Sequence, residues 1–167
     1  MADQITLDLQ AVWDILEQVS DPEIPVLTVT DLGIVRDVKQ TADGHVEVVI
    51  TPTYSGCPAM NTIEVNIRAV LQDHGYDPVQ VTTVLSPAWT TDWMTESGKQ
   101  KLKAYGIAPP EPGNVDKHAL FQDDKKVECP RCSSRNTTMI AQFGSTACKS
   151  MYRCLDCLEP FDYFKCH

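Results

Sequence analysis

Four cysteines near the C-terminus form two Cys-x-x-Cys pairs, Cys129 with Cys132 and Cys154 with Cys157. Each pair can place two thiolates on one metal ion from a tight turn, and two such turns complete a tetrahedral site. The alternative is four unrelated buried thiols, but a segment of about 40 residues buries too little surface to fold without a crosslink or a metal. The spacing therefore predicts a structural four-thiolate zinc site, with iron as the competing metal because geometry alone does not separate the two.

Cys148 and Cys166 lie on either side of the second pair. One tetrahedral ion needs only four ligands, so these two cysteines are either free thiols packed as small hydrophobic side chains or ligands of a second, labile site. We favour the free thiols because cysteine is commonly buried in proteins.

Aromatic side chains are dense in the same segment. They either brace hairpins by cross-strand pairing, which we favour, or form a patch that binds a partner. Residues 121–167 carry 7 Lys/Arg against 6 Asp/Glu, and this balance is a poor electrostatic footprint for nucleic acid. The aromatic residues are Phe143, Tyr152, Phe161, Tyr163 and Phe164.

Cys57 is the second candidate for chemistry. Pro58 follows it, and apolar residues at helical spacing, from Met60 to Leu71, come next. Proline is favoured at the first position of a helix, so we expect Cys57 to be the N-cap. A thiol at a helix N-terminus ionises more readily, and it becomes a better metal ligand or nucleophile. Val46, Val48 and Ile50 alternate before it, so Cys57 is expected where a strand turns into a helix.

Asp21 and Glu23 are the candidate carboxylates beside Cys57. They flank Pro22 after the first predicted helix, and without the fold they could equally be solvated acids at a helix stop. If the fold brings them to Cys57, carboxylate and thiolate could share a metal or a proton. The histidines His45 and His74 are expected to lie far from Cys57, which leaves a papain-like hydrolase without its base.

The elements that must position these residues follow from periodicity and turn signals. Together they predict a small α+β domain of order α-β-β-α-β-α, with its helices on one sheet face and no glycine-rich phosphate loop. The predicted elements are a helix over residues 8–19, strands over residues 34–39 and 46–51, the helix after Cys57 closed by Gly75, a third strand from Val79 to Leu85, and a helix that is capped by Thr95, runs to Tyr105 and is closed by Gly106.

Charge is spread unevenly along the chain. Residues 1–120 carry 7 Lys/Arg against 17 Asp/Glu, so this part should repel nucleic acid, and the change near residue 120 suggests a boundary. Prolines and charges favour a linker over residues 108–126, between a domain at residues 1–107 and a zinc ribbon at residues 127–167. We expect a cytoplasmic protein without a membrane partner, because no signal pattern or long apolar run is present.

Three stretches together resemble the SufT-like iron–sulphur cluster assembly and targeting family. They are DPEIPVLTVTDLGIVRDV, TYSGCP and PAWTTDWMTESGKQKLKAYGI, within residues 8–107. The family's middle motif is closer to Thr-Thr-Pro-x-Cys-Pro, and this chain departs from it at Tyr54 and Ser55. The resemblance implies that Asp21, Glu23 and Thr53 are neighbours of Cys57. Trp89, Thr90 and Thr91 are expected to line the same face.

The C-terminal segment FGSTACKSMYRCLDCLEPFDYFKC narrows the resemblance. With it, nearly the whole chain resembles the accessory subunits of phenylacetyl-CoA oxygenase (epoxidase), the PaaD/PaaJ type. Those subunits show an acid before Pro-Ala-Trp where this chain has Ser86. The resemblance implies a role in aerobic phenylacetate breakdown, with the oxygenase and reductase subunits as partners.

The resulting hypothesis is an accessory protein that matures an iron or iron–sulphur centre in those partners, with Cys57 as the transfer or docking thiol. Besides structural zinc, it would carry iron or a cluster transiently, and the iron–sulphur assembly machinery and a second copy of the chain are further candidate partners. The chain has no Glu-x-x-His pair for a di-iron site and no flavin or nicotinamide fingerprint. A purely structural subunit bound in the oxygenase complex is the alternative, and a cysteine-dependent enzyme is a third.

Overall fold

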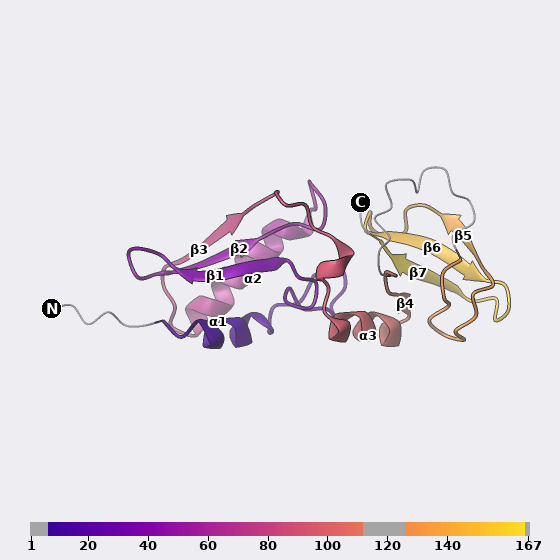
Figure 1. Ribbon diagram of the computed structural model, residues 1–167, viewed down its shortest axis with the longest axis horizontal. Coiled ribbons are helices and arrows are strands. Elements are labelled where there is room, and N and C mark those ends of the chain that lie inside the picture. The colour runs from indigo at the N-terminus through magenta and orange to yellow at the C-terminus, as the bar shows by residue number, and fades with distance from the viewer. Residues whose placement is uncertain (1–6, 112–125, 166–167) are drawn as a thin grey trace. The chain divides into compact units, whose positions relative to one another are not determined.

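The structure, a computed structural model, describes residues 7–111 and 126–165 (Figure 1). The chain divides after Trp89 into two compact units. Cys166, one of the two extra cysteines of the tail, lies outside the described residues, as does most of the predicted linker. No helix in the described ranges is both long enough and apolar enough to cross a lipid bilayer.

The first unit contains a three-stranded sheet of order β1-β2-β3 and two helices. β1 and β2 are antiparallel, joined by a turn in which Gly44 has φ +85°, a left-handed conformation that glycine adopts at little cost. β2 and β3 are parallel, and α2 makes the crossover between them. The elements are α1 (Leu9–Leu16), β1 (Val35–Gln40), β2 (Val46–Ile50), α2 (Ala59–Asp73) and β3 (Val79–Thr83).

The core of the first unit is aliphatic. Val46, Val48 and Ile50 of β2 are all buried, because alternate residues of a strand share a face. The buried residues of α2, among them Ile63 and Leu71, recur at helical spacing. α2 packs against β3 and α1, and α1 also packs against β1 (Figure 1).

The strand directions bring three loops to one end of this sheet. Val35, the first residue of β1, pairs with Ile50, the last residue of β2, which in turn lies beside Thr83 at the end of β3. The loop before β1, the loop after β2 and the chain after β3 therefore meet at the same end of the sheet. These segments carry Asp21, Cys57 and Trp89 respectively.

The second unit contains a short 3-10 helix, one α-helix and a four-stranded sheet of order β4-β7-β6-β5. The helix α3 begins and ends as predicted, since the Thr95 hydroxyl accepts a hydrogen bond from the Gly98 amide and Gly106 has φ +93°. The elements are η1 (Thr91–Trp93), α3 (Glu96–Tyr105), β4 (Ile107–Ala108), β5 (Thr137–Ala141), β6 (Lys149–Cys154) and β7 (Pro160–Phe164).

The predicted α+β class and the order α-β-β-α-β-α are confirmed. Differences are local: β3 ends at Thr83, and Leu85 is 63% exposed. Ile107 and Ala108 form β4, which pairs in parallel with Asp162 and Tyr163 of β7. Two residues at the predicted junction of first domain and linker thus belong to the ribbon sheet, while the domain limits at residues 107 and 127 stay predictions.

Candidate metal centre and thiol site

The four cysteines of the two Cys-x-x-Cys pairs converge. Their Sγ atoms all lie within 4.8 Å of one another, with 3.8 Å between Cys129 and Cys157 and 3.5 Å between Cys132 and Cys154. Tetrahedral zinc with Zn–S bonds of about 2.3 Å requires sulphurs roughly 3.8 Å apart. The donor set therefore fits one metal ion with four thiolates.

Two backbone turns of the same form build this cage. The Cys129 amide donates to the Ser134 carbonyl over 2.9 Å, and the Cys154 amide donates to the Glu159 carbonyl, also five residues on, over 3.0 Å. The residue after the second cysteine of each pair has a left-handed backbone, with φ +61° at Ser133 and +66° at Leu158. Both pairs are thus held in tight loops of equal length.

The thiols of the cage differ in acidity. The backbone amide of Cys157 lowers the pKa of the Cys154 thiol to about 7, against burial and with help from the amide of Asp156. The backbone amide of Ser134 acts in the same direction on Cys132, but burial and the neighbouring thiols raise the pKa of Cys132 to about 12. A metal ion would replace the protons that the thiols hold, because the thiolate is the ligand.

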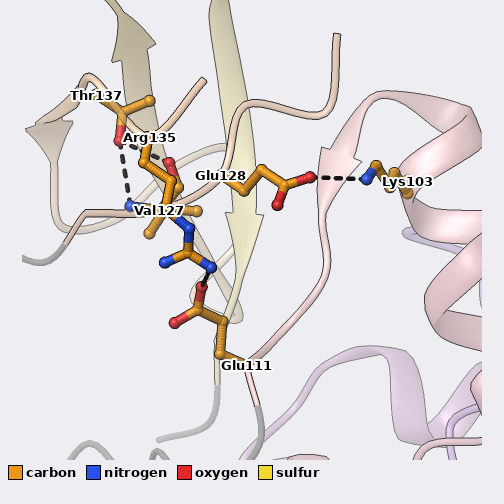
Figure 2. A network of polar contacts seen from close by, with 6 residues as sticks. All are labelled: Lys103, Glu111, Val127, Glu128, Arg135 and Thr137. Atoms are coloured by element: carbon orange, nitrogen blue, oxygen red, sulfur yellow. Dashed lines mark hydrogen bonds and ion pairs between the residues drawn. The ribbon is translucent and has the colours of Figure 1, made fainter. Parts of the chain in front are cut away.

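Side chains outside the cage hold the segment that enters it. The buried Thr137 hydroxyl accepts from the Val127 amide over 3.1 Å and donates to the Val127 carbonyl over 2.7 Å (Figure 2). Next to this contact, Lys103 of α3 pairs with Glu128 over 2.8 Å. All of this lies just before Cys129, so the entry into the first turn is fixed by contacts from both β5 and α3.

A second ion pair lies close by, between Arg135 and Glu111, over 2.9 Å (Figure 2). Glu111 follows β4, and Arg135 precedes β5. The helix α3 and strand β4 are thus joined to the ribbon by strand pairing and by two salt bridges. The residues of both ion pairs also line a cavity of about 200 Å³ whose walls include Pro109, Pro110 and Pro130.

Three of the five aromatic residues brace the ribbon as expected. Tyr152 and Phe161 are directly paired across β6 and β7, with stacked rings 5.9 Å apart, and Tyr163 meets Tyr152 edge-on at 5.8 Å. Phe164 is buried, but Phe143 is 56% exposed and carries the Lys165 ammonium over its ring. The interpretation of the aromatic residues as hairpin braces is confirmed for Tyr152, Phe161 and Tyr163.

Cys148 is buried, and its Sγ lies 3.0 Å from the Thr146 hydroxyl. This position fits the expectation of a thiol packed as a small hydrophobic side chain. The alternative of a second labile site requires Cys166 as well, and it stays a prediction because Cys166 lies outside the described residues.

Cys57 lies where β2 turns into α2, as predicted, but it is not the N-cap. The cap is Pro58, the helix begins at Ala59, and no side chain caps it. The physical reason is a turn just before the helix: the Cys57 amide donates to the Tyr54 carbonyl over 3.3 Å, and Gly56 has φ +86°. Cys57 thus precedes the cap by one residue and is half-buried.

Hydrogen bonds join the three loops that meet around this end of the sheet. The Thr51 amide donates to the Ile34 carbonyl over 2.9 Å, and the Val84 amide donates to the Ile50 carbonyl over 2.9 Å. The indole Nε1 of the buried Trp89 donates to the Leu32 carbonyl over 2.8 Å. Trp89 therefore fixes the loop before β1 against the chain after β3.

Asp21 uses its carboxylate within its own loop. Its Oδ1 accepts from the amides of Glu23 and Ile24 over 2.7 and 2.8 Å, and the side chain is buried. Within residues 7–111 and 126–165, the only group of three or more potential metal-ligating side chains is that of the four ribbon cysteines. A grouping of Asp21, Glu23 and the half-buried Thr53 around Cys57 stays a prediction.

The remaining predicted residues fall in two places. Thr90 and Thr91 begin the second unit, so their relation to Cys57 also stays a prediction. His45 precedes β2, whose other end leads to Cys57, and His74 follows α2, whose first turn follows Cys57. Both histidines are exposed and lie at the far ends of these elements, as predicted.

Sequence reasoning missed two groups. Thr51 is buried, and its hydroxyl is without a hydrogen-bond partner in the described part of the chain. Asp156 accepts hydrogen bonds from the side chains of Ser134 and Asn136, which hold the pKa of its carboxyl below the usual range. Neither residue gave a signal, because the burial of Thr51 and the hydrogen bonds of Asp156 both depend on how segments distant in the sequence pack together.

Comparison with known proteins divides the chain in a similar way. A family described as iron-sulfur cluster assembly protein matches residues 9–84, and one described as PaaD zinc beta ribbon domain matches residues 113–165. A protein of Escherichia coli (strain K12), named as a subunit of 1,2-phenylacetyl-CoA epoxidase, is 53% identical over 155 residues, covering 93% of this chain and 91% of that protein.

The chain belongs to the PaaD-type family of phenylacetyl-CoA epoxidase subunits. The part before the ribbon has relatives without this tail. An "Fe-S protein maturation auxiliary factor" of Porphyromonas gingivalis is 38% identical over 88 residues, covering 52% of this chain and 83% of that protein. A crystal structure of a domain of unknown function, DUF59, from Bacillus anthracis has a TM-score of 0.53 and 27% identity, covering 56% of this chain and 90% of that one.

Proposed function

We propose that this member of the PaaD-type family is an accessory protein that matures an iron or iron–sulphur centre in the phenylacetyl-CoA epoxidase system of phenylacetate breakdown. One observation carries the proposal: a region matching iron-sulfur cluster assembly proteins is combined, in one chain, with the ribbon of the PaaD-type family. The partners would be the oxygenase and reductase subunits, and the iron or cluster would be cargo. The assembly machinery and a second copy of the chain are further proposed partners.

Cys57 is the proposed transfer or docking thiol. It is half-buried, and it follows β2 at the end of the sheet where three loops meet. No hydrogen bond to another side chain occupies its sulphur in the described part of the chain, so the sulphur is available to an incoming metal. Transfer would proceed by ligand exchange, in which a partner's ligand replaces the Cys57 thiolate without a change in oxidation state.

Asp21, Glu23 and Thr53 are the proposed oxygen-bearing neighbours, and Trp89, Thr90 and Thr91 the proposed lining of the same face. Support for the carboxylates is that their loop meets the Cys57 loop at one sheet end. Asp21 shapes that loop through its two backbone hydrogen bonds. Asp21→Asn keeps the oxygen that accepts both bonds and removes the charge, so it should preserve the loop, whereas Asp21→Ala should disturb the loop that carries Glu23.

The test compares Cys57→Ser with Cys148→Ser in cells that depend on the epoxidase. Cys148 is the matched control, because it is also outside the ribbon cage but is buried. We expect Cys57→Ser to lower epoxidase activity and the iron content of the purified partner subunits, while Cys148→Ser leaves both near the wild-type level. Unchanged activity and partner iron in Cys57→Ser would contradict the transfer role.

The ribbon is proposed to hold zinc as a structural ion and to dock a partner. The sulphur spacing fits one ion, whereas a multi-iron cluster attaches its cysteines to different irons and would need some of them farther apart. Metal analysis and an absorption spectrum of anaerobically purified protein test this. A colourless protein with one zinc per chain is expected, and a brown protein would show that iron is held as well.

A structural subunit that stays bound in the oxygenase complex is the second candidate. The observation that favours it is the name of the Escherichia coli relative, which designates a subunit. Co-purification with the oxygenase in stoichiometric amounts, together with full activity of Cys57→Ala, would support this candidate over maturation.

A further inference from the structure

A side-chain link joins the two metal-binding turns of the ribbon directly. Asp156 lies between Cys154 and Cys157 in the second turn. Its Oδ2 accepts from the Ser134 hydroxyl, and its Oδ1 accepts from Asn136 Nδ2 over 2.7 Å. Ser134 and Asn136 follow the first turn, so one carboxylate is bonded to the other half of the cage through both of its oxygens.

Two hydrogen bonds from backbone amides reinforce this link. The Asn136 amide donates to the Ser134 hydroxyl oxygen over 3.0 Å, and the Leu155 amide donates to the Asn136 carbonyl over 2.8 Å. Asp156 and Leu155 are therefore both held on the segment 134–136. The side chains that meet here are polar and lie at the surface rather than in the apolar core.

The link spans the gap that the metal ion must also span. The turns are separated by residues 133–153, and the sulphur contacts of 3.5 and 3.8 Å each join one turn to the other. Ordering two segments costs conformational entropy. This cost weakens metal binding unless other contacts have already ordered the two segments. A bond between the turns that does not involve sulphur reduces this cost.

We propose that Asp156, with Ser134 and Asn136, is a positioning residue that sets how tightly the ribbon holds its metal ion. The inference rests on the proposed zinc site. Charge-assisted hydrogen bonds through both carboxylate oxygens give the link direction as well as strength. Removing an outer-shell partner of a metal ligand typically lowers metal affinity about 10- to 100-fold. Because the Asp156 link is exposed to water, we expect the lower end of this range, roughly tenfold.

The experiment measures zinc affinity of the full chain by competition with a chromophoric chelator, and the absorption spectrum of the cobalt-substituted protein. Asp156→Ala should weaken zinc binding about tenfold, and Asp156→Asn, which keeps one acceptor oxygen, should fall between it and the wild type. Glu159→Gln is the matched control, because it also removes a negative charge from the second turn. Glu159 follows Cys157 by two residues, as Ser134 follows Cys132 in the first turn. It should leave the affinity nearly unchanged.

Ser134→Ala combined with Asn136→Ala gives a second route, should Asp156→Ala fail to fold. This pair should weaken binding to a similar degree, and adding Asp156→Ala should weaken it no further, since all three act through one link. Equal affinities of Asp156→Ala and Glu159→Gln, or fully additive losses, would overturn the proposal. A wild-type chain that binds no metal would instead refute the zinc site on which it rests.

Discussion

The first unit and the ribbon bury different kinds of core. In the first unit, aliphatic residues of α1 and α2 pack against a three-stranded sheet. In the ribbon, a cluster of seven buried residues includes two of the proposed metal ligands, Cys129 and Cys154. The ribbon therefore uses the same side chains for packing and for metal chemistry, whereas the candidate thiol of the first unit, Cys57, lies outside its core.

This comparison predicts that the two units respond differently to metal removal, the largest expected effect. A strong chelator should unfold the ribbon, since metal binding in such domains contributes about 10–16 kcal/mol at neutral pH. Amide signals of the first unit in a two-dimensional NMR spectrum should stay dispersed while those of β5 to β7 collapse. A ribbon that keeps its fold without metal would show that its aromatic core suffices.

The converse test truncates the aliphatic core. Leu71, on α2, is fully buried, so Leu71→Ala should lower the free energy of unfolding of the first unit by about 2–5 kcal/mol. Val65 on the same helix is 62% exposed, and Val65→Ala should change it by no more than about 0.5 kcal/mol. Urea unfolding followed by circular dichroism checks both. A loss of bound zinc in Leu71→Ala would contradict the prediction that the two units respond separately.

The ribbon turns offer a smaller, stabilising change. Leu158 has φ +66° and is 59% exposed, so it bears backbone strain and buries little. Leu158→Gly should stabilise the metal-loaded ribbon by up to about 1 kcal/mol, because a left-handed backbone costs a side chain about 1–2 kcal/mol and glycine loses part of this in entropy. Thermal unfolding at saturating zinc measures it.

Leu155→Gly is the control for this substitution. Leu155 belongs to the same turn and is 46% exposed, but its φ is not positive. Glycine there should destabilise the ribbon by about 0.5–1 kcal/mol. Equal effects of the two substitutions would show that strain at Leu158 is not relieved.

The smallest expected effect is electrostatic and lies in the first unit. A hydrogen bond from the Thr82 hydroxyl, 2.7 Å long, and the nearby Lys39 lower the pKa of Glu47 from its ordinary value of 4.5. The folded chain then keeps this carboxylate charged where the unfolded chain protonates it. The resulting stabilisation is present above pH 4.5 and is lost as the pH falls through the lowered pKa.

Thr82→Val should therefore raise the pKa of Glu47 and slightly reduce stability at neutral pH, with a smaller reduction in acid. Carboxyl titration by NMR measures the first effect, and urea unfolding at two pH values measures the second. Thr83→Val, at the next position of β3, should leave the pKa of Glu47 unchanged. A similar shift in both variants would contradict the role of the Thr82 hydroxyl.

Local signals in the sequence determined the elements and the ligands. Thr95 and Gly106 mark the ends of α3, alternation marks β2, and the Cys-x-x-Cys spacing marks the four cage cysteines. These are interactions between residues close along the chain, so their pattern can be read without knowing the fold. The N-cap assignment of Cys57 failed by one residue, because the turn at Gly56 was not recognised.

Only the tertiary structure decided which distant segments meet. The parallel pairing of β2 with β3 brings the loops of Cys57 and Trp89 to one sheet end, and that of β4 with β7 attaches residues 107–108 to the ribbon. The contacts of Asp156 with Ser134 and Asn136 are of the same kind. Such contacts depend on which distant segments pair and in which direction. The side-chain periodicity of a segment indicates its type of element but does not specify its partner.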